Sequence, residues 1–259
     1  MNNPAMLDES IQIGTRRRVT ANLRDALAVV VAFFWQTVDG GPVSARNPFK
    51  FAGHSYDFVL RGFSDRIVAG AYASVGLNSD MGAAELLRVL AAHHDGLIPT
   101  LSDELAFWEM EVKKLASDPH DSSPEGLLWA WYKAFKGGMV NGVRTPGIDG
   151  VGTAGYSKTG HWGWPRQMPL VDSVVLKFWS GQNMWVELHK TLTDNEAWFD
   201  ELERLIEIYR NSFQNNDGMP IYRLRATDVL TWVHGSGQWE ETLVAGRALL
   251  ASCSDVATW

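Results

Sequence analysis

The sequence is most informative over residues 146–179, PGIDGVGTAGYSKTGHWGWPRQMPLVDSVVLKFW, and we expect the rest of the chain to pack around them. They predict a helix-hairpin-helix, then a short loop, then a helix opened by Asp172. Gly150-Val151-Gly152 signals the turn, because glycine adopts positive φ and lets a second backbone approach. Thr153 then caps the following helix. Such a turn presents unpaired N–H groups that can hold a phosphate oxygen without any basic side chain. The predicted helix carries Ala154, Tyr156, Ser157, Lys158 and Trp162.

Asp172 is the first candidate for chemistry. It lies between apolar neighbours in residues 168–175, MPLVDSVV, at the predicted N-terminus of a buried helix. The helix dipole favours its ionised form, whereas burial favours its neutral form. A carboxylate under these opposed influences is a candidate general base or a stabiliser of positive charge. The alternative is that Asp172 only caps its helix.

These residues resemble the core of the helix-hairpin-helix DNA glycosylase superfamily, in particular bacterial proteins with an 8-oxoguanine DNA glycosylase-like fold. The family pattern is a GxG turn, a lysine and a P-x-x-D lead into the next helix. Gly150 and Gly152, Lys158, and Pro169 with Asp172 match it in this chain. Residues 222–235, YRLRATDVLTWVHG, resemble the closing helix of an uncharacterised bacterial family with that core.

The resemblance implies an all-α, two-lobed glycosylase-like fold and base excision or AP-lyase activity on damaged or modified nucleic acid, DNA rather than RNA. It implies that Asp172 and Lys158 are catalytic. It requires no organic cofactor or structural metal, and allows a monovalent cation at the hairpin turn. Related proteins occur in bacterial anti-phage systems, which suggests a role in defence. The backbone that holds phosphate would be that of Gly150, Gly152, Thr153 and Ala154.

The chain departs from the family pattern at the lysine. In bifunctional glycosylases the lyase lysine follows the turn at once, and Ala154 occupies that position here. Lys158 comes four residues later, on the same helix face one turn along, so it either faces the same cleft or is a surface lysine. The alternative function is therefore a catalytically degenerate module that binds nucleic acid or a protein partner.

Aromatic residues surround the predicted helix and have two interpretations. They can wall a base pocket, because an extruded base stacks on aromatic rings. They can equally fill the core between helices. The base-pocket candidates are Tyr156, His161, Trp162 and Trp164, and Trp179 follows them in the sequence.

The composition indicates a sizeable hydrophobic core that is not cross-linked by disulfide bonds. The chain has 259 residues, 46% of them hydrophobic, with 12 tryptophans and one cysteine. One cysteine excludes an internal disulfide and a cysteine zinc site, and no run of eighteen apolar residues occurs. We expect a cytoplasmic protein with no membrane partner and nine to eleven helices. The expected organisation is a disordered segment over residues 1–14 and one helical domain over residues 15–259, with an interlobe loop at 118–124.

The net charge of −7 argues against a dedicated duplex binder, which is usually basic. Binding would then rest on a local patch, on the amide groups of the turn, or on a partner. Arg16, Arg17 and Arg18 form a short basic run that either contacts phosphate or is the solvated flank of a helix. Asp228 and His234 are candidates for a polar second layer around the site or for helix-terminus roles.

Overall fold

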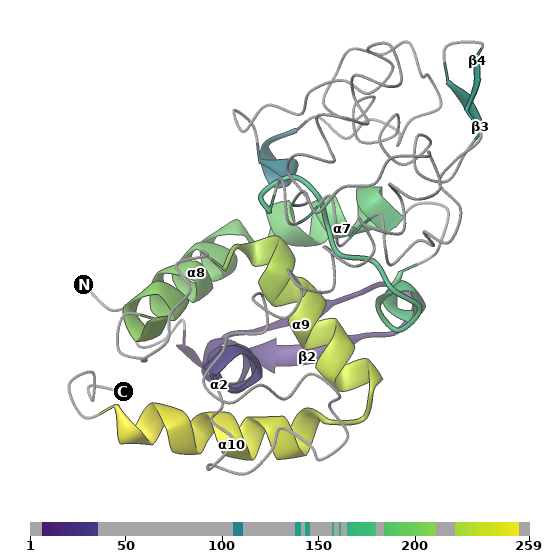
Figure 1. The fold of residues 1–259 in the computed structure, drawn as a ribbon. Helices are drawn as coiled ribbons and strands as arrows, with labels where there is room; N and C mark the ends of the chain where they lie inside the picture. The colour runs from purple at the N-terminus through teal and green to yellow at the C-terminus, as the bar shows by residue number, and fades with distance from the viewer. Residues whose placement is uncertain are drawn as a thin grey trace, which may run out of the picture. The chain divides into compact units, whose positions relative to one another are not determined.

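A computed structural model describes residues 7–35, 106–110, 138–140, 143–145, 157, 161, 165–179, 184–210 and 221–253, most of them in helices (Figure 1). The chain divides into two units. Unit 1 comprises Met1–Val59, Val174–Gln182 and Lys190–Trp259, and unit 2 comprises Leu60–Ser173 and Asn183–His189. The mainly helical architecture agrees with the predicted fold class. The two-lobed glycosylase-like arrangement stays a prediction, and the predicted interlobe loop at 118–124 lies outside the described residues.

The core of unit 1 is built around helix α2 (Leu23–Trp35). Its sequence LRDALAVVVAFFW is apolar on every side after the first turn, and all residues from Ala26 to Phe34 are buried. A helix that is apolar all round must be covered on all faces. Helices α8 (Glu196–Arg210), α9 (Arg223–Gly235) and α10 (Trp239–Ser252) surround it (Figure 1). Asn22 caps α2, since its Oδ1 accepts the Asp25 amide at 2.8 Å.

The contact between α2 and α10 is very close. Gly246 of α10 lies against the backbone of Ala28, and a Cβ atom at position 246 would stand 1.8 Å from the Ala28 carbonyl oxygen. Only a residue without a side chain fits there. The amphipathic α8 adds a row of buried apolar residues, Trp198, Phe199, Leu202, Leu205, Ile206 and Tyr209.

Residues 10–13 form a strand, so the prediction of a disordered segment over residues 1–14 is wrong for them. β1 (Ser10–Ile13) pairs antiparallel with β2 (Val19–Asn22), with Ile13 opposite Val19. Alternate residues of both strands are buried, and the indole N–H of Trp198 donates to the Glu9 carbonyl at 3.1 Å. These tertiary contacts supply the order that the polar composition of the segment does not predict.

A second hairpin also departs from the all-α prediction. β3 (Gly138–Val140) pairs antiparallel with β4 (Val143–Thr145), and Val140 lies opposite Val143. The two residues between the strands are Asn141 and Gly142. Asn-Gly between apolar residues is the strongest short-range hairpin signal, since both residues tolerate positive φ.

The described part of unit 2 is a small packed cluster. The 3₁₀ helix η1 (Phe107–Glu109) buries Phe107 completely, and its ring lies 6.1 Å from the Trp185 ring and 5.8 Å from the His189 ring. Trp185 and His189 belong to α7 (Met184–Asp194), which continues into unit 1 from Lys190. The Phe107 amide donates to the Arg166 carbonyl at 2.9 Å, which ties η1 to the segment that precedes Asp172.

Candidate functional site

A pair of buried polar side chains holds the segment that leads to Asp172. Ser157 and His161 have helical backbone, as the sequence predicts, and are separated by one helical turn. The Ser157 hydroxyl donates to the Val171 carbonyl at 3.0 Å and accepts the Val171 amide at 3.1 Å. His161 Nδ1 lies 2.7 Å from the Met168 carbonyl oxygen, which requires a proton on Nδ1. We call these contacts the Ser157–His161 clamp.

The clamp fixes both ends of the short segment from Met168 to Val171. Both backbone groups of Val171 are paired with a single hydroxyl, and Met168 is fixed three residues earlier. Met168, Leu170 and Val171 are buried. The backbone that enters Asp172 is therefore held by buried hydrogen bonds, which are costly to break.

Asp172 does not open a helix, so that prediction is wrong. Residues 173 and 174 form a turn, and the helix that follows is the short 3₁₀ helix η2 (Val175–Phe178), whose N-cap is Val174 and has no side-chain cap. The interpretation of Asp172 as an ordinary helix cap fails for the same reason. Asp172 is half-buried and lies directly after the clamped Val171. A carboxylate in that position is held by its backbone and retains access to solvent.

His161 has a different role from the one predicted. Its side chain is 3% exposed and its Nδ1 is committed to the Met168 carbonyl. A ring enclosed in this way offers no free face to an extruded base. Trp179 is likewise 1% exposed, which agrees with the core interpretation of that aromatic residue. The base-pocket hypothesis therefore depends on the other three aromatic candidates.

The remaining predicted site residues lie outside the described part of the chain. They are the phosphate-binding turn residues, the lysine and three aromatic candidates, namely Gly150, Gly152, Thr153, Ala154, Tyr156, Lys158, Trp162 and Trp164. The sequence did not single out Ser157 as functional. The sequence feature that could have indicated Ser157 is its spacing of four from His161. This spacing places two polar side chains on one helix face, shortly before the apolar residues 168–171.

Helix α9 carries two buried arginines, both neutralised within unit 1. Arg223 forms ion pairs with Asp200 and with Glu203, and its amide also donates to Glu203. Arg225 pairs with Asp228, and its guanidinium lies 5.3 Å from the ring centres of both Phe33 and Phe34. Asp228 thus serves as the counter-ion of a buried arginine. Its predicted helix-terminus role is replaced by this structural one.

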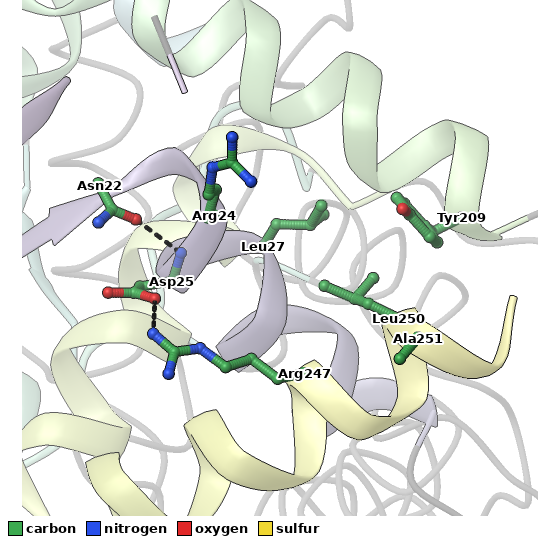
Figure 2. Close-up of a pocket in the computed structure, with 8 residues that line it drawn as sticks. All are labelled: Asn22, Arg24, Asp25, Leu27, Tyr209, Arg247, Leu250 and Ala251. Atoms are coloured by element: carbon green, nitrogen blue, oxygen red, sulfur yellow. Dashed lines mark hydrogen bonds and ion pairs between the residues drawn. The ribbon is translucent and has the colours of Figure 1, made fainter. Parts of the chain in front are cut away.

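Unit 1 also contains a pocket of about 530 Å³ (Figure 2). Both arginines of its lining are paired with carboxylates, Arg247 with Asp25 of the lining at 2.7 Å and Arg24 with Asp8 at 3.3 Å. The apolar part is formed by residues of α2, α8 and α10, as Figure 2 shows for Leu27, Tyr209 and Leu250. Of the predicted site residues that the structure describes, neither Asp172 nor His161 is among the described residues that line this pocket, which are Asn22, Arg24, Asp25, Leu27, Tyr209, Arg247, Leu250 and Ala251.

No three histidine, cysteine, aspartate or glutamate side chains of the described segments gather into a group that could hold a metal ion. Within the same segments, no helix combines the length and apolar character needed to cross a membrane. The hairpin turn at which a monovalent cation was expected lies outside them.

The comparisons with known proteins return no relative. No protein-family model matches the chain, and neither a curated protein nor a solved structure matches it.

Proposed function

We propose that the protein acts on a base in nucleic acid, as a DNA glycosylase with AP-lyase activity in which Asp172 and Lys158 carry the chemistry. The observation that supports this best is the Ser157–His161 clamp. Ser157 precedes Lys158 in the sequence, and Val171 precedes Asp172. The hydrogen bonds between Ser157 and Val171 join the two chain segments that carry the proposed catalytic residues.

In the proposed reaction, the neutral amine of Lys158 attacks C1′ of the sugar as the C1′–N bond to the base breaks. The base leaves with the bonding electron pair and takes up a proton. The Asp172 carboxylate stabilises the positive charge that develops at C1′, or accepts the proton that the attacking amine loses. Opening of the sugar ring gives a Schiff base between Lys158 and C1′. Ser157 is a positioning residue, since it acts through the backbone of Val171.

Borohydride trapping on duplex and single-stranded oligonucleotides that carry 8-oxoguanine, uracil or an abasic site tests this proposal. We expect a trapped covalent species with the unaltered protein and none with Lys158→Gln. Asp172→Asn should lower the rate by about 100-fold or more, the usual contribution of a positioned acid or base. Lys177→Gln and Asp194→Asn remove the same charges from exposed positions and should change nothing. Trapping that survives Lys158→Gln, with base release unchanged in Asp172→Asn, would exclude this chemistry.

The positioning role of Ser157 has its own test. Ser157→Ala removes both hydrogen bonds to Val171, whereas Ser157→Thr keeps a hydroxyl. We expect Ser157→Ala to lower kcat with little change in KM, and Ser157→Thr to retain much of the rate. An equal loss in both variants would indicate that Ser157 serves folding alone.

A module of the same fold that binds nucleic acid or a protein partner without catalysis is the second candidate. The net charge of −7 and the alanine at position 154 favour it. It predicts no trapped species and no base release, together with binding that Lys158→Gln and Asp172→Asn leave unaltered.

A further inference from the structure

The β1–β2 hairpin presents three consecutive arginines at its tip. Ile13 and Val19 are opposite each other in the sheet and buried, while all four residues from Thr15 to Arg18 are exposed. We call residues 14–18, GTRRR, the arginine turn. The sequence left two interpretations of this run, a contact with phosphate or the solvated flank of a helix. The structure instead places it between the strands β1 and β2, in a bend where all three side chains are exposed.

The arginine turn is fixed in place by its backbone. Gly14 has φ of +96°, and an added Cβ would stand 2.2 Å from the Arg17 carbonyl oxygen. The Thr15 and Arg16 amides both donate to the Phe178 carbonyl, at 2.8 and 3.0 Å. The Arg17 guanidinium lies 5.3 Å from the centre of the Phe178 ring, itself fully buried. The backbone of the turn is therefore preformed, and only the exposed side chains have to be ordered when a ligand binds.

The charges of the arginine turn are not neutralised by the described residues. Arg18 donates to the neutral amide of Gln12 at 3.1 Å, and none of Arg16, Arg17 and Arg18 forms an ion pair with a carboxylate of the described part of the chain. Every other arginine whose side chain the structure describes does so. Those paired arginines are Arg24, Arg166, Arg204, Arg210, Arg223, Arg225 and Arg247.

This contrast matters because the chain holds 30 acidic residues against 23 basic ones. Carboxylates are abundant, yet none of those in the described segments pairs with these three adjacent, exposed guanidinium groups. Guanidinium binds phosphate oxygens through two parallel hydrogen bonds, so each of the three side chains can hold one phosphate group. A basic turn of this size supplies the local patch that an acidic nucleic-acid-binding protein requires.

We propose that the arginine turn is a phosphate-binding surface that contacts the backbone of a nucleic acid. The choice of nucleic acid as the polyanion rests on the proposed function. The surface itself rests on the geometry of residues 14–18 and is independent of Lys158 and Asp172. It reads no base, since contacts to phosphate carry no sequence information.

The test is fluorescence anisotropy of a labelled 20-nucleotide single strand and of its duplex, between 50 and 200 mM NaCl. The variant Arg16→Gln/Arg17→Gln/Arg18→Gln is compared with a matched control, Arg24→Gln/Arg204→Gln/Arg247→Gln, which loses the same charge from paired, exposed positions. Each phosphate contact contributes a salt slope of about 0.7 for single strands and about 0.9 for duplexes. The turn variant should lower the slope by about 2 to 3, and the control should not.

Several results would overturn the proposal. These are an unchanged salt slope in the turn variant, an equal loss in the matched control, or no binding of either oligonucleotide by the unaltered protein. Binding only to vesicles of phosphatidylserine and phosphatidylcholine would assign the turn to a membrane surface instead. These results can be told apart from a failure of the proposed chemistry. If the variant without the three arginines still traps substrate normally, phosphate binding by the arginine turn is refuted and the proposed chemistry is not.

A second test of the phosphate contact uses the unaltered protein and therefore needs no variant that folds. His234 lies edge-on to Phe178, and its pKa is lowered by burial and by the positive charge of Arg17. A phosphate on Arg17 compensates that charge, so oligonucleotide binding should raise the pKa of His234 in the unaltered protein, as followed by NMR of the imidazole. A His234 titration that saturating oligonucleotide leaves unmoved would count against a contact at Arg17.

Discussion

Gly14 is the residue on which the conformation of the arginine turn depends. We expect Gly14→Ala to destabilise the protein by about 2–4 kcal/mol, as left-handed strain and overpacking against the Arg17 carbonyl add together. Gly237 is the matched control, because its φ is +76° but nothing lies within 4 Å of an added Cβ. Gly237→Ala should cost about 1 kcal/mol, from the strain alone. Urea unfolding measures both, and equal losses would contradict the close contact at Gly14.

His234 should make the stability of the protein depend on pH. Its pKa is lowered from 6.5 by burial and by Arg17, so the folded chain binds fewer protons at this site than the unfolded chain. The resulting stabilisation is fully present above pH 6.5 and is lost as the pH falls toward the folded pKa. We expect the decrease in Tm between pH 7.5 and 5.5 to be smaller in His234→Phe, which cannot titrate.

Arg17→Gln is the control for this pH effect. It leaves the burial of His234 in place and removes only the neighbouring charge. Its decrease in Tm should therefore lie between those of the unaltered protein and His234→Phe. A decrease in His234→Phe as large as in the unaltered protein would assign the acid sensitivity to other groups.

For individual residues, the sequence predicted burial and backbone type more accurately than it predicted the contacts of each side chain. The apolar neighbours of Asp172 correctly indicated a partly buried carboxylate, and the helical backbone of Ser157 was expected. The helix cap was not correct, because Ser173 and Val174 form a turn before η2 begins. The burial of His161 depends on the Met168 carbonyl seven residues away, a contact that local patterns do not contain.

At the element scale, the close contact between α2 and α10 gives the sharpest prediction. Alanine normally stabilises a helix relative to glycine by about 1 kcal/mol. At position 246 we expect the opposite, a loss of at least about 2 kcal/mol, because the Ala28 backbone can move only if α2 moves. Val244→Ala, at a side chain that is 67% exposed on the same helix, should change stability by less than about 0.5 kcal/mol. Thermal unfolding of both variants tests this prediction. A Gly246→Ala variant more stable than the unaltered protein would refute the close contact between α10 and the Ala28 backbone.

The two hairpins show why helices were easier to predict than strands. The apolar run in α2 is long enough to predict burial from composition alone. β1 and β2 contain only four residues each. In β1, Ile11 and Ile13 alternate with polar residues, but this pattern is too short to indicate a strand after the polar residues that precede it. The Asn141-Gly142 pair was a readable hairpin signal. No turn was predicted at this pair.

At the scale of the whole molecule, net charge proved a poor guide to local charge. The value of −7 covers the whole chain, whereas the arginines whose side chains the structure describes are of two kinds, those that pair with carboxylates and the three of the arginine turn. Sequence alone does not separate them, because the pairing of Arg247 with Asp25 joins residues 222 positions apart. Only the fold shows where positive charge remains available for a polyanion.

Unit 1 joins the first and last parts of the chain, so its folding should require both. The buried faces of α2, from Ala26 to Phe34, need the cover that α10 provides. A chain that ends after Gly237 lacks α10 and should lose cooperative thermal unfolding by circular dichroism and bind a hydrophobic dye. A chain that ends after Cys253 keeps all of α10 and serves as the control. If the shorter chain unfolded cooperatively at the temperature of the control, α2 would not depend on α10, and the core of unit 1 would have to be built from α8 and α9 alone.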